Sequence, residues 1–381
     1  MAEKTQETKP PRQSVLHSRH GELGAVFSEE LFTGEAYRRF LIPEHFGDPD
    51  AEHRAVRSAA GMFDLSHTGL LMVVGSGAAG ALDRFFTNDV AQLDGPGKCQ
   101  YTLACDERGG IFADLILYRF TADGFMLTCG SHRWYDLAMA IEDSPPDGVE
   151  VRVLNDSHVC FAVEGPEAGA ILDELGLPTG HSRLSFEIGS DEWGDPFVNR
   201  WGSSGEDGYT LILPNADARR LWDALLDRGV RPCGLRAREQ LRIEMGYPSV
   251  PADLIGGVTP NQARLGWAVA WGKEAFSGKV ALDIEQAAGP SHRLWGLELL
   301  GDRVIEPGGP RAGAVYDGGR EVGEVTSAGY SPTLDKSIAL ALIEADLGPG
   351  SELELHLEDG SGEDRIRARV VKPPFIPEPR R

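Results

Sequence analysis

Residues 101–118 read YTLACDERGGIFADLILY, and the rest of the chain can be interpreted around this stretch. Two apolar runs flank the polar segment DERGG at 106–110, a pattern that predicts a β-hairpin with a glycine-rich turn. Asp114 stands inside the second run, where an unpaired charge in a dry core would be costly. We therefore expect its carboxylate to face a cavity or a buried donor. The structural alternative is that Asp114 caps a turn or pairs with an arginine.

Length and composition indicate a soluble protein of several domains. A chain of 381 residues is too long for one compact core and predicts two or three domains. The apolar share of 41% is ordinary, and no apolar run approaches the roughly 18 residues of a membrane span. Residues 1–14 are polar and lack the apolar segment of a signal peptide, which predicts a disordered tail and a cytoplasmic location.

Charge and motif content exclude several classes of function. The net charge of -22, from 37 basic and 59 acidic residues, argues against nucleic acid or an anionic membrane as a partner. The five cysteines form no CxxC pair and no zinc spacing, so we expect reduced thiols and no metal site. No Walker-type phosphate-binding, GxSxG or HExxH motif occurs. Acidic residues in cavities are therefore the candidates for chemistry.

The order of predicted elements indicates an α+β protein. Strands, hairpins and helices alternate through the first 250 residues, with helices expected over 50–60, 76–86, 131–141, 167–175, 217–228 and 237–245. Ser76 is a plausible N-cap for the second of these helices. After about Val280 helical patterns nearly vanish, and short strands between Gly, Pro and Asp turns predict a small antiparallel barrel.

An ordered series of motifs resembles the aminomethyltransferase family, which includes the T-protein of the glycine cleavage system. Besides the hairpin, these motifs are HRAVR at 53–57, FDLSH at 63–67, TNDV at 87–90, VEGP at 163–166, SGEDG at 204–208, LRIEMG at 241–246, TP at 259–260, LGW at 265–267 and GEVTS at 323–327. The resemblance covers residues 50 to 375. It implies a ring of three domains, two α+β domains and a C-terminal antiparallel β-barrel, around a central channel that holds tetrahydrofolate.

On this basis the chain is expected to divide into five parts. They are a disordered tail at 1–14, a discontinuous folate-binding α+β domain at 15–60 plus 150–250, a second α+β domain carrying Asp114 at 61–149, an irregular connector at 251–282 and the barrel at 283–381.

The resemblance also assigns roles to two carboxylates. Asp114 matches the family's catalytic carboxylate, and the resemblance also implies that it contacts the folate. Glu206, in SGEDG, matches the residue that grips the pterin ring, and a carboxylate can accept two hydrogen bonds from an aminopyrimidinone. The alternative for Glu206 is a solvated turn residue.

Five further positions are implied to surround the folate. Arg238 matches a folate-contacting arginine, although a surface salt bridge is an equal alternative. Tyr101, Ile116 and Tyr118 match pocket-lining positions on the hairpin, where the tyrosines could equally be core. Cys129 ends a strand, MLTC at 126–129, that should abut the pocket, or it is simply a small apolar filler.

Several departures from the T-protein pattern concern the one-carbon donor. The chain reads IPEHFGD at 42–48 where T-proteins have a Phe-Gly-Trp-x-Met-Pro type of segment. Cys129 replaces a typical Asn and Gln262 replaces a frequent Glu. The two serines at 203–204, which replace Tyr-Thr, concern instead how tightly the turn before Glu206 packs. His67 and His132 are candidate donor-side groups, with a structural histidine as the alternative for each.

The implied function is a tetrahydrofolate-dependent one-carbon transferase. It would move a methylene or methyl unit from an amine or methylated small molecule to N5 of tetrahydrofolate. Two alternatives are a genuine glycine cleavage aminomethyltransferase acting on a lipoylated carrier protein, and a non-catalytic folate-binding protein that supports iron–sulfur assembly. Against the last, the chain lacks a Lys-Gly-Cys-Tyr-x-Gly-Gln motif, reading EMGYP at 244–248, and keeps Asp114.

Overall fold

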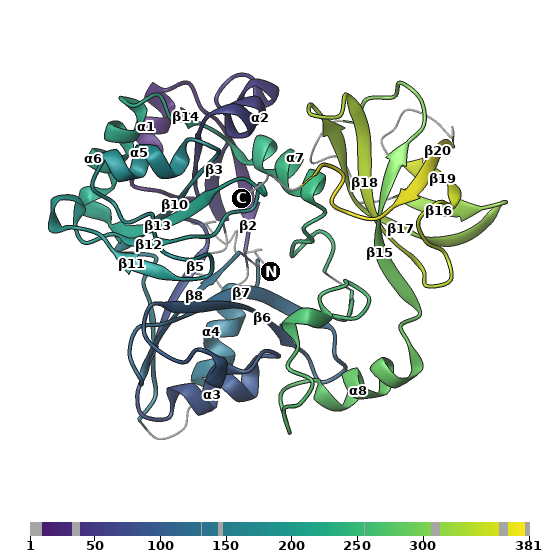
Figure 1. Cartoon of the computed structure of the whole chain (residues 1–381), viewed down its shortest axis with the longest axis horizontal. Helices are drawn as coiled ribbons and strands as arrows, with labels where there is room; N and C mark the ends of the chain where they lie inside the picture. The colour runs from purple at the N-terminus through teal and green to yellow at the C-terminus, as the bar shows by residue number, and fades with distance from the viewer. Residues whose placement is uncertain are drawn as a thin grey trace, which may run out of the picture.

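The computed structural model describes residues 10–32, 39–130, 132–143, 148–254, 256–305, 313–357 and 365–377. Most of the predicted tail, the first residue of the helix expected at 131–141 and the loop at 144–147 lie outside these ranges. The described chain forms three units, with α7 and the segment that follows it between them (Figure 1). The predicted α+β class and the C-terminal barrel are confirmed.

The first unit contains a three-stranded and a six-stranded sheet. The small sheet has the order β1-β3-β2 and the large one β11-β12-β13-β10-β4-β14. Their strands are β1 (Arg12–Gln13), β2 (Val26–Leu31), β3 (Arg39–His45), β4 (Gly61–Asp64), β10 (His158–Glu164), β11 (Phe186–Ile188), β12 (Phe197–Asn199), β13 (Gly208–Pro214) and β14 (Arg231–Pro232). The helices of this unit are α1 (His17–Glu22), α2 (Pro49–Ser58), α5 (Ala168–Glu174), α6 (Asn215–Leu226) and α7 (Leu235–Met245).

The second unit is an antiparallel sheet of order β6-β7-β8-β5-β9. Its strands are β5 (Gly69–Val74), β6 (Lys98–Cys105), β7 (Ile111–Arg119), β8 (Gly124–Cys129) and β9 (Glu150–Val153). Helices α3 (Ala78–Phe85) and α4 (Trp134–Glu142) share an apolar core with one face of this sheet. The opposite face shares a core with the six-stranded sheet, so the two sheets pack against each other.

The third unit is a closed antiparallel barrel of order β15-β18-β17-β16-β19-β20. Its strands are β15 (His292–Leu299), β16 (Gly313–Asp317), β17 (Arg320–Ser331), β18 (Lys336–Glu344), β19 (Glu352–Leu357) and β20 (Ile366–Val371). The barrel is reached through α8 (Lys279–Ala288).

The hairpin at 101–118 forms as predicted, and glycine is required at its two turn positions for different reasons. Gly109 adopts φ +84°, a left-handed conformation that favours glycine. A Cβ on Gly110 would lie 2.8 Å from the backbone of Gly257. The turn therefore packs directly on the connector, where the amide of Ile111 also donates to the carbonyl of Val258 at 2.8 Å.

Strand pairing differs from the predicted boundaries at two places. β4, which was expected in the second domain, pairs with β10 and β14 in the first unit. β9, which was expected in the first domain, pairs with β5 in the second. Each of these strands belongs to the neighbouring unit, so the two sheets extend four residues beyond the predicted limits of 60 and 149.

Two helix predictions are also corrected. The helix α8 begins at Lys279, where helical signals were expected to vanish; its Val280 and Ile284 are 75% and 67% exposed. Helix α3 begins after Gly77 without a side-chain cap, so Ser76 is not its N-cap.

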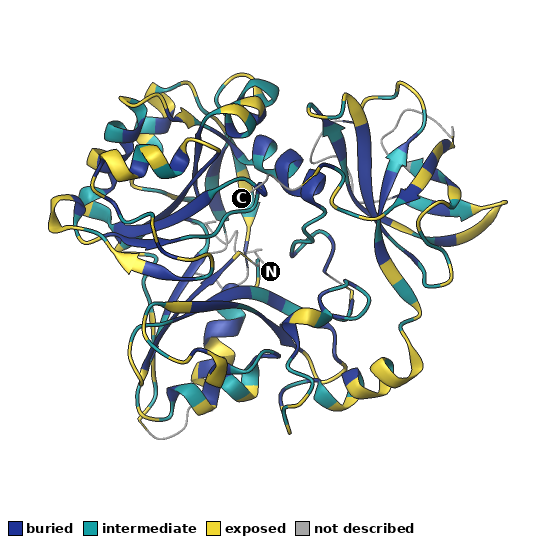
Figure 2. Cartoon of the chain, in the orientation of Figure 1, coloured by how far each residue is buried: buried dark blue, intermediate teal, exposed yellow. Residues whose placement is uncertain are grey.

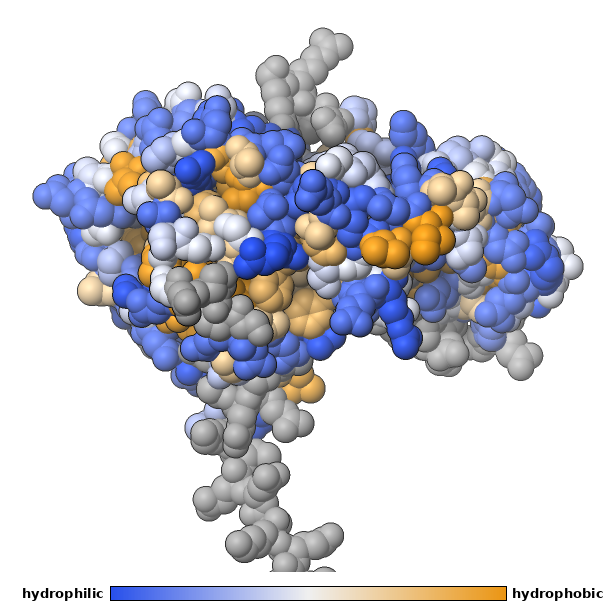
Figure 3. All heavy atoms as spheres, turned by 90° about the horizontal axis from the view of Figure 1, so that it is seen from below, coloured by the Kyte–Doolittle hydropathy of each residue, from blue (hydrophilic) through white to orange (hydrophobic). Residues whose placement is uncertain are grey.

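The distribution of side chains is that of three packed units with a polar surface. Buried residues follow the strands and the inner helix faces (Figure 2), and hydrophilic side chains dominate the face seen from below, with small hydrophobic patches between them (Figure 3). All five cysteines lie within the described ranges, are buried and are not held in disulfides. No helix within the described ranges is both long enough and apolar enough to cross a membrane.

Candidate functional site

The pleat of β7 separates its side chains onto two faces. Ala113, Leu115 and Leu117 pack in the core beneath α3 and α4. Ile116 and Tyr118 pack on the opposite face, against the six-stranded sheet. Because side chains alternate along a strand, Asp114 belongs to this second face.

Asp114 is a half-buried carboxylate with few donors. The Tyr101 hydroxyl donates to its Oδ2 at 3.3 Å. Burial raises the pKa of Asp114 to about 6, although Tyr101 and the positive charges of Arg238 and Arg242 act in the opposite direction. A carboxylate that titrates close to neutral pH can both accept and return a proton.

Tyr101 stacks with two tryptophan rings beside Asp114. The Trp201 ring lies 6.4 Å from it at an interplanar angle of 28°, and the Trp267 ring lies 5.2 Å away at 29°. Trp267 is 63% exposed, which is unusual for an indole with a stacking partner. Together the three rings offer a surface on which a flat heteroaromatic ligand could stack.

The other two hairpin positions belong to the core between the sheets. Tyr118 is 1% exposed, and its ring packs edge-on to Phe197 at 4.9 Å. Its hydroxyl lies 3.0 Å from Thr128 Oγ1 and accepts a hydrogen bond from Asn199 at 3.1 Å. Ile116 is also buried and is the cross-strand neighbour of Tyr101.

Cys129 is fully buried at the end of β8, opposite Leu115 of β7. Both residues belong to the apolar cluster that lies beneath α3 and α4. The structure therefore packs Cys129 with the core of the second unit.

Arg238 lines a cavity of about 520 Å³ between β2, β3, α7, residues 249–252 and β17. Among the described residues its guanidinium forms no ion pair or hydrogen bond, and its Nε is buried without a partner. An unpaired buried charge is costly, so an arginine in this state suits an anionic or hydrogen-bond-accepting ligand. Of the predicted cofactor-binding residues, Arg238 is the one that lines this cavity.

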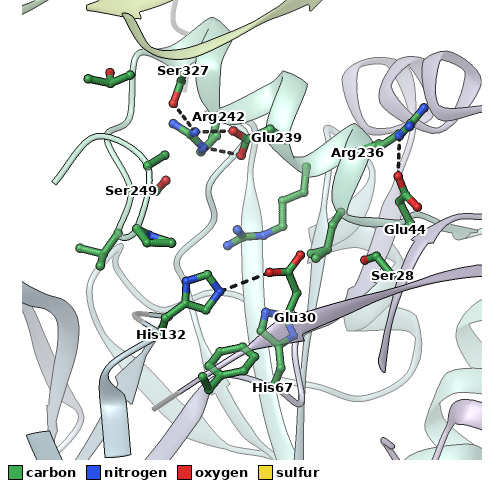
Figure 4. Close-up of a pocket in the computed structure, with 18 of the residues that line it drawn as sticks. Ser28, Glu30, Glu44, His67, His132, Arg236, Glu239, Arg242, Ser249 and Ser327 are labelled. Carbon is green, nitrogen blue, oxygen red and sulfur yellow. Dashed lines mark hydrogen bonds and ion pairs between the residues drawn. The ribbon is translucent and has the colours of Figure 1, made fainter. Parts of the chain in front are cut away.

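The cavity carries charges of both signs (Figure 4). Glu30 faces His132, with 3.3 Å between Oε2 and Nε2. His67 also lines the cavity, and burial lowers its pKa to about 4, so this imidazole is neutral at physiological pH. His67 and His132, the two candidate donor-side groups, thus share one cavity.

A buried network between α7 and the barrel forms one wall of the cavity. Arg242 donates to Asp253 at 2.9 Å and to the Ser327 hydroxyl at 2.7 Å, and also pairs with Glu239. Asp253 accepts further hydrogen bonds from Thr326 and Ser327 of β17. These contacts hold α7 against the barrel.

Glu206 lies in the turn before β13, as the motif predicts, and is half-buried. Its Oε1 accepts a hydrogen bond from Arg57 at 2.9 Å. Among the described residues it forms no hydrogen bond or ion pair with Asp114.

Three important residues were not identified from the sequence. Arg57 was quoted within a motif without a role, and Trp201 was not considered. Trp267 was part of the LGW motif, but only the structure shows that its ring is exposed and stacked on Tyr101. Within the described ranges no cluster of His, Cys, Asp and Glu is arranged to hold a metal ion.

Comparison with known proteins matches both parts of the chain. Residues 16–273 match the family model of the GCVT N-terminal domain, and residues 292–376 match the glycine cleavage T-protein C-terminal barrel domain.

Full-length relatives are similar throughout. An aminomethyltransferase from Parafrankia sp. (strain EAN1pec) is 41% identical over 376 residues, 96% of this chain and 98% of the relative. One from Mycobacterium tuberculosis (strain ATCC 25618 / H37Rv) is 40% identical over 367 residues, with 95% and 96% covered.

A solved structure shows the same fold. The crystal structure of glycine cleavage system aminomethyltransferase T from Bartonella henselae superposes with a TM-score of 0.87 at 30% identity, covering 97% of this chain and 99% of that one. The predicted resemblance is therefore confirmed over nearly the whole length. The chain belongs to the aminomethyltransferase family and is an enzyme of the transferase class.

Proposed function

We propose that this chain is a glycine cleavage aminomethyltransferase that uses tetrahydrofolate as the acceptor of the one-carbon unit. The donor would be an aminomethyl group on the lipoyl arm of a carrier protein. The observation that supports this proposal most directly is Asp114, a carboxylate whose pKa burial raises to about 6, beside an aromatic stack. Family membership supplies the reaction class.

Tetrahydrofolate would supply the N5 and N10 nitrogens that share the methylene group of the product. The methylene carbon would leave the carrier sulfur and the amine, and the two hydrogens displaced from N5 and N10 would go to the sulfur and to the departing ammonia. Asp114 is suited to orient the N5 side of the pterin and to stabilise the positive charge that develops there. It can also relay one of these protons, because its pKa lies near 6.

Other residues would bind and orient the acceptor. Tyr101, Trp201 and Trp267 offer flat faces to the pterin or aminobenzoyl ring. Glu206 would accept hydrogen bonds from the pterin ring, and the unpaired guanidinium of Arg238 would bind a carbonyl or carboxylate of the folate. Ile116, Tyr118 and Cys129 would act from the core, by fixing the strands beneath this site.

A methylated small amine is the second candidate donor. Glu30 and Glu44 line the charged cavity, and Glu44 lies in the segment 42–48 that departs from the T-protein pattern. Carboxylates placed there could hold a small cationic donor near Arg238.

Two measurements test these proposals. Calorimetric titration with tetrahydrofolate should show saturable binding, and turnover should require a lipoylated, aminomethyl-loaded carrier protein. Turnover with a methylated small amine but not with the carrier would replace the first donor by the second. Absence of tetrahydrofolate binding would overturn the folate assignment itself.

A further inference from the structure

Arg57, near the end of α2, joins two carboxylates that come from different parts of the chain. Its Nη1 donates to Glu206 Oε1 at 2.9 Å and to the carbonyl of Ser204 at 2.6 Å. Its Nε and Nη2 donate to Glu244 Oε2 at 3.1 Å and 2.6 Å. The guanidinium is 12% exposed, so these charge-assisted bonds are formed largely away from water and hold a defined geometry.

Glu244 is the fixed end of this arrangement. It is fully buried on α7, with its Oε2 3.0 Å from His53 Nε2, and it accepts a hydrogen bond from the Ser331 hydroxyl of barrel strand β17. Burial raises the pKa of Glu244, but His53, Arg57 and Ser331 outweigh that effect and the pKa falls to about 2. The carboxylate is therefore ionised at neutral pH and holds Arg57 in one orientation.

Glu206 is the end that remains available to a ligand. Gly205 has φ +84°, and a Cβ there would lie 2.5 Å from the Met245 sulfur, so this turn packs closely on α7. Arg57 occupies one lone pair of Glu206 Oε1, whereas Oε2 accepts no hydrogen bond from the described residues. A carboxylate can accept about four hydrogen bonds, so sites remain for a ligand with adjacent N–H groups.

We infer that Arg57 is a positioning residue for Glu206, and that the C-terminal barrel fixes Arg57 through Ser331 and Glu244. This inference rests on the proposed function, in which Glu206 holds the pterin ring. Arg57 forms no hydrogen bond or ion pair with Asp114 among the described residues, so its loss should weaken folate binding and leave the chemical step largely intact. A purely structural arginine would lower stability without changing folate affinity.

The test combines calorimetric titration of tetrahydrofolate into the full chain with steady-state rates. Arg57→Gln should weaken binding about tenfold, because one charged partner of Glu206 is removed, while kcat stays within about twofold of wild type. Arg57→Lys should restore part of the affinity, because the charge returns without the two-sided geometry. The double change of Arg57→Gln with Glu206→Gln should cost less than the sum of the single changes, as expected for residues acting on one interaction.

Two further variants keep the result interpretable. Arg54→Gln is a matched control on the same helix, since Arg54 is 59% exposed and lies 4.0 Å from Asp48; it should bind tetrahydrofolate like wild type. Ser331→Ala is the milder variant should Arg57→Gln fail to fold, and it should weaken binding about two- to fivefold. Wild-type affinity in the folded Arg57 and Ser331 variants overturns the inference and leaves the proposed function standing. A wild-type chain that does not bind tetrahydrofolate overturns both.

Discussion

Asp114 and Glu206 show two different ways in which this fold holds a half-buried carboxylate. Among the described residues, one side chain, the phenol of Tyr101, donates to Asp114, and burial raises its pKa to about 6. Glu206 instead accepts a charged hydrogen bond from Arg57, which is itself anchored on Glu244. A carboxylate left short of donors is suited to proton transfer, whereas one fixed by a guanidinium is suited to recognition.

The strongest test of this difference between Asp114 and Glu206 is to remove the charge of Asp114. Asp114→Asn should lower kcat roughly ten- to ten-thousandfold, the range for general-base or electrostatic roles. Tetrahydrofolate affinity should change far less, because most of the contacts that bind it are assigned to other groups. Single-turnover transfer with the loaded carrier, beside calorimetry, measures both. An unchanged rate in a folded variant would remove Asp114 from the mechanism.

Replacing Glu206 should give the opposite pattern. Glu206→Gln should weaken tetrahydrofolate binding about ten- to a hundredfold through the loss of charge-assisted hydrogen bonds, with a small effect on kcat at saturation. Asp207→Asn is the matched control in the same turn, because Asp207 Oδ1 accepts a hydrogen bond from Arg200 at 3.1 Å instead of from Arg57. Equal affinities for the Glu206 and Asp207 variants would contradict the assignment.

The difference in stability between the wild type and the Asp114→Asn variant should depend on pH. The folded-state pKa of about 6 lies above the ordinary value of 3.8, so the stability associated with protonated Asp114 is present below about 4 and lost as pH rises through 6. Asparagine does not ionise, so the variant does not lose stability over this pH range. The variant should therefore be more stable than wild type at pH 8, on the order of 1–3 kcal/mol, and similar at pH 4. Urea unfolding at the two pH values measures the difference, and equal differences at both would contradict it.

Tyr101→Phe should produce the smallest change. The Tyr101 hydrogen bond lowers the pKa of Asp114, so its removal should move the acidic limb of the pH–rate profile upward while the aromatic stack stays in place. The maximal rate should change by only a few-fold. A limb that stays in place would show that Tyr101 does not tune Asp114.

Local patterns in the sequence were enough to predict much of the architecture. The hairpin at 101–118, the α+β class and the barrel follow from alternation and turn residues near each other in the chain. Strand pairing was harder. β4 and β9 carry no local mark of which sheet they join, because their partners lie elsewhere in the sequence. Helix α8 escaped detection because Val280 and Ile284 face solvent instead of marking a buried stripe.

The site residues likewise divide into those that the sequence could identify and those that only the folded structure shows. Asp114 could be singled out because a charge in an apolar run is anomalous, and the geometry agrees that it faces a donor, Tyr101. Arg57 could not be linked to Glu206, because 149 positions separate them and only the folded chain brings them together. The sequence also could not show that Tyr118 lies in the core, because an aromatic residue in a strand has the same sequence pattern whether it lines a pocket or packs in a core.

The polar wall between α7 and the barrel has a consequence for how the protein melts. Separating the barrel from α7 would leave the side chains of Arg242 and Asp253, which are 5% and 0% exposed, without their hydrogen-bond partners Ser327 and Thr326. Because a half-broken set of buried charges is strongly destabilising, the barrel and the first unit should denature together. We therefore expect a single calorimetric transition. A barrel supplied as a separate fragment should stabilise the rest of the chain less than the covalently linked barrel does.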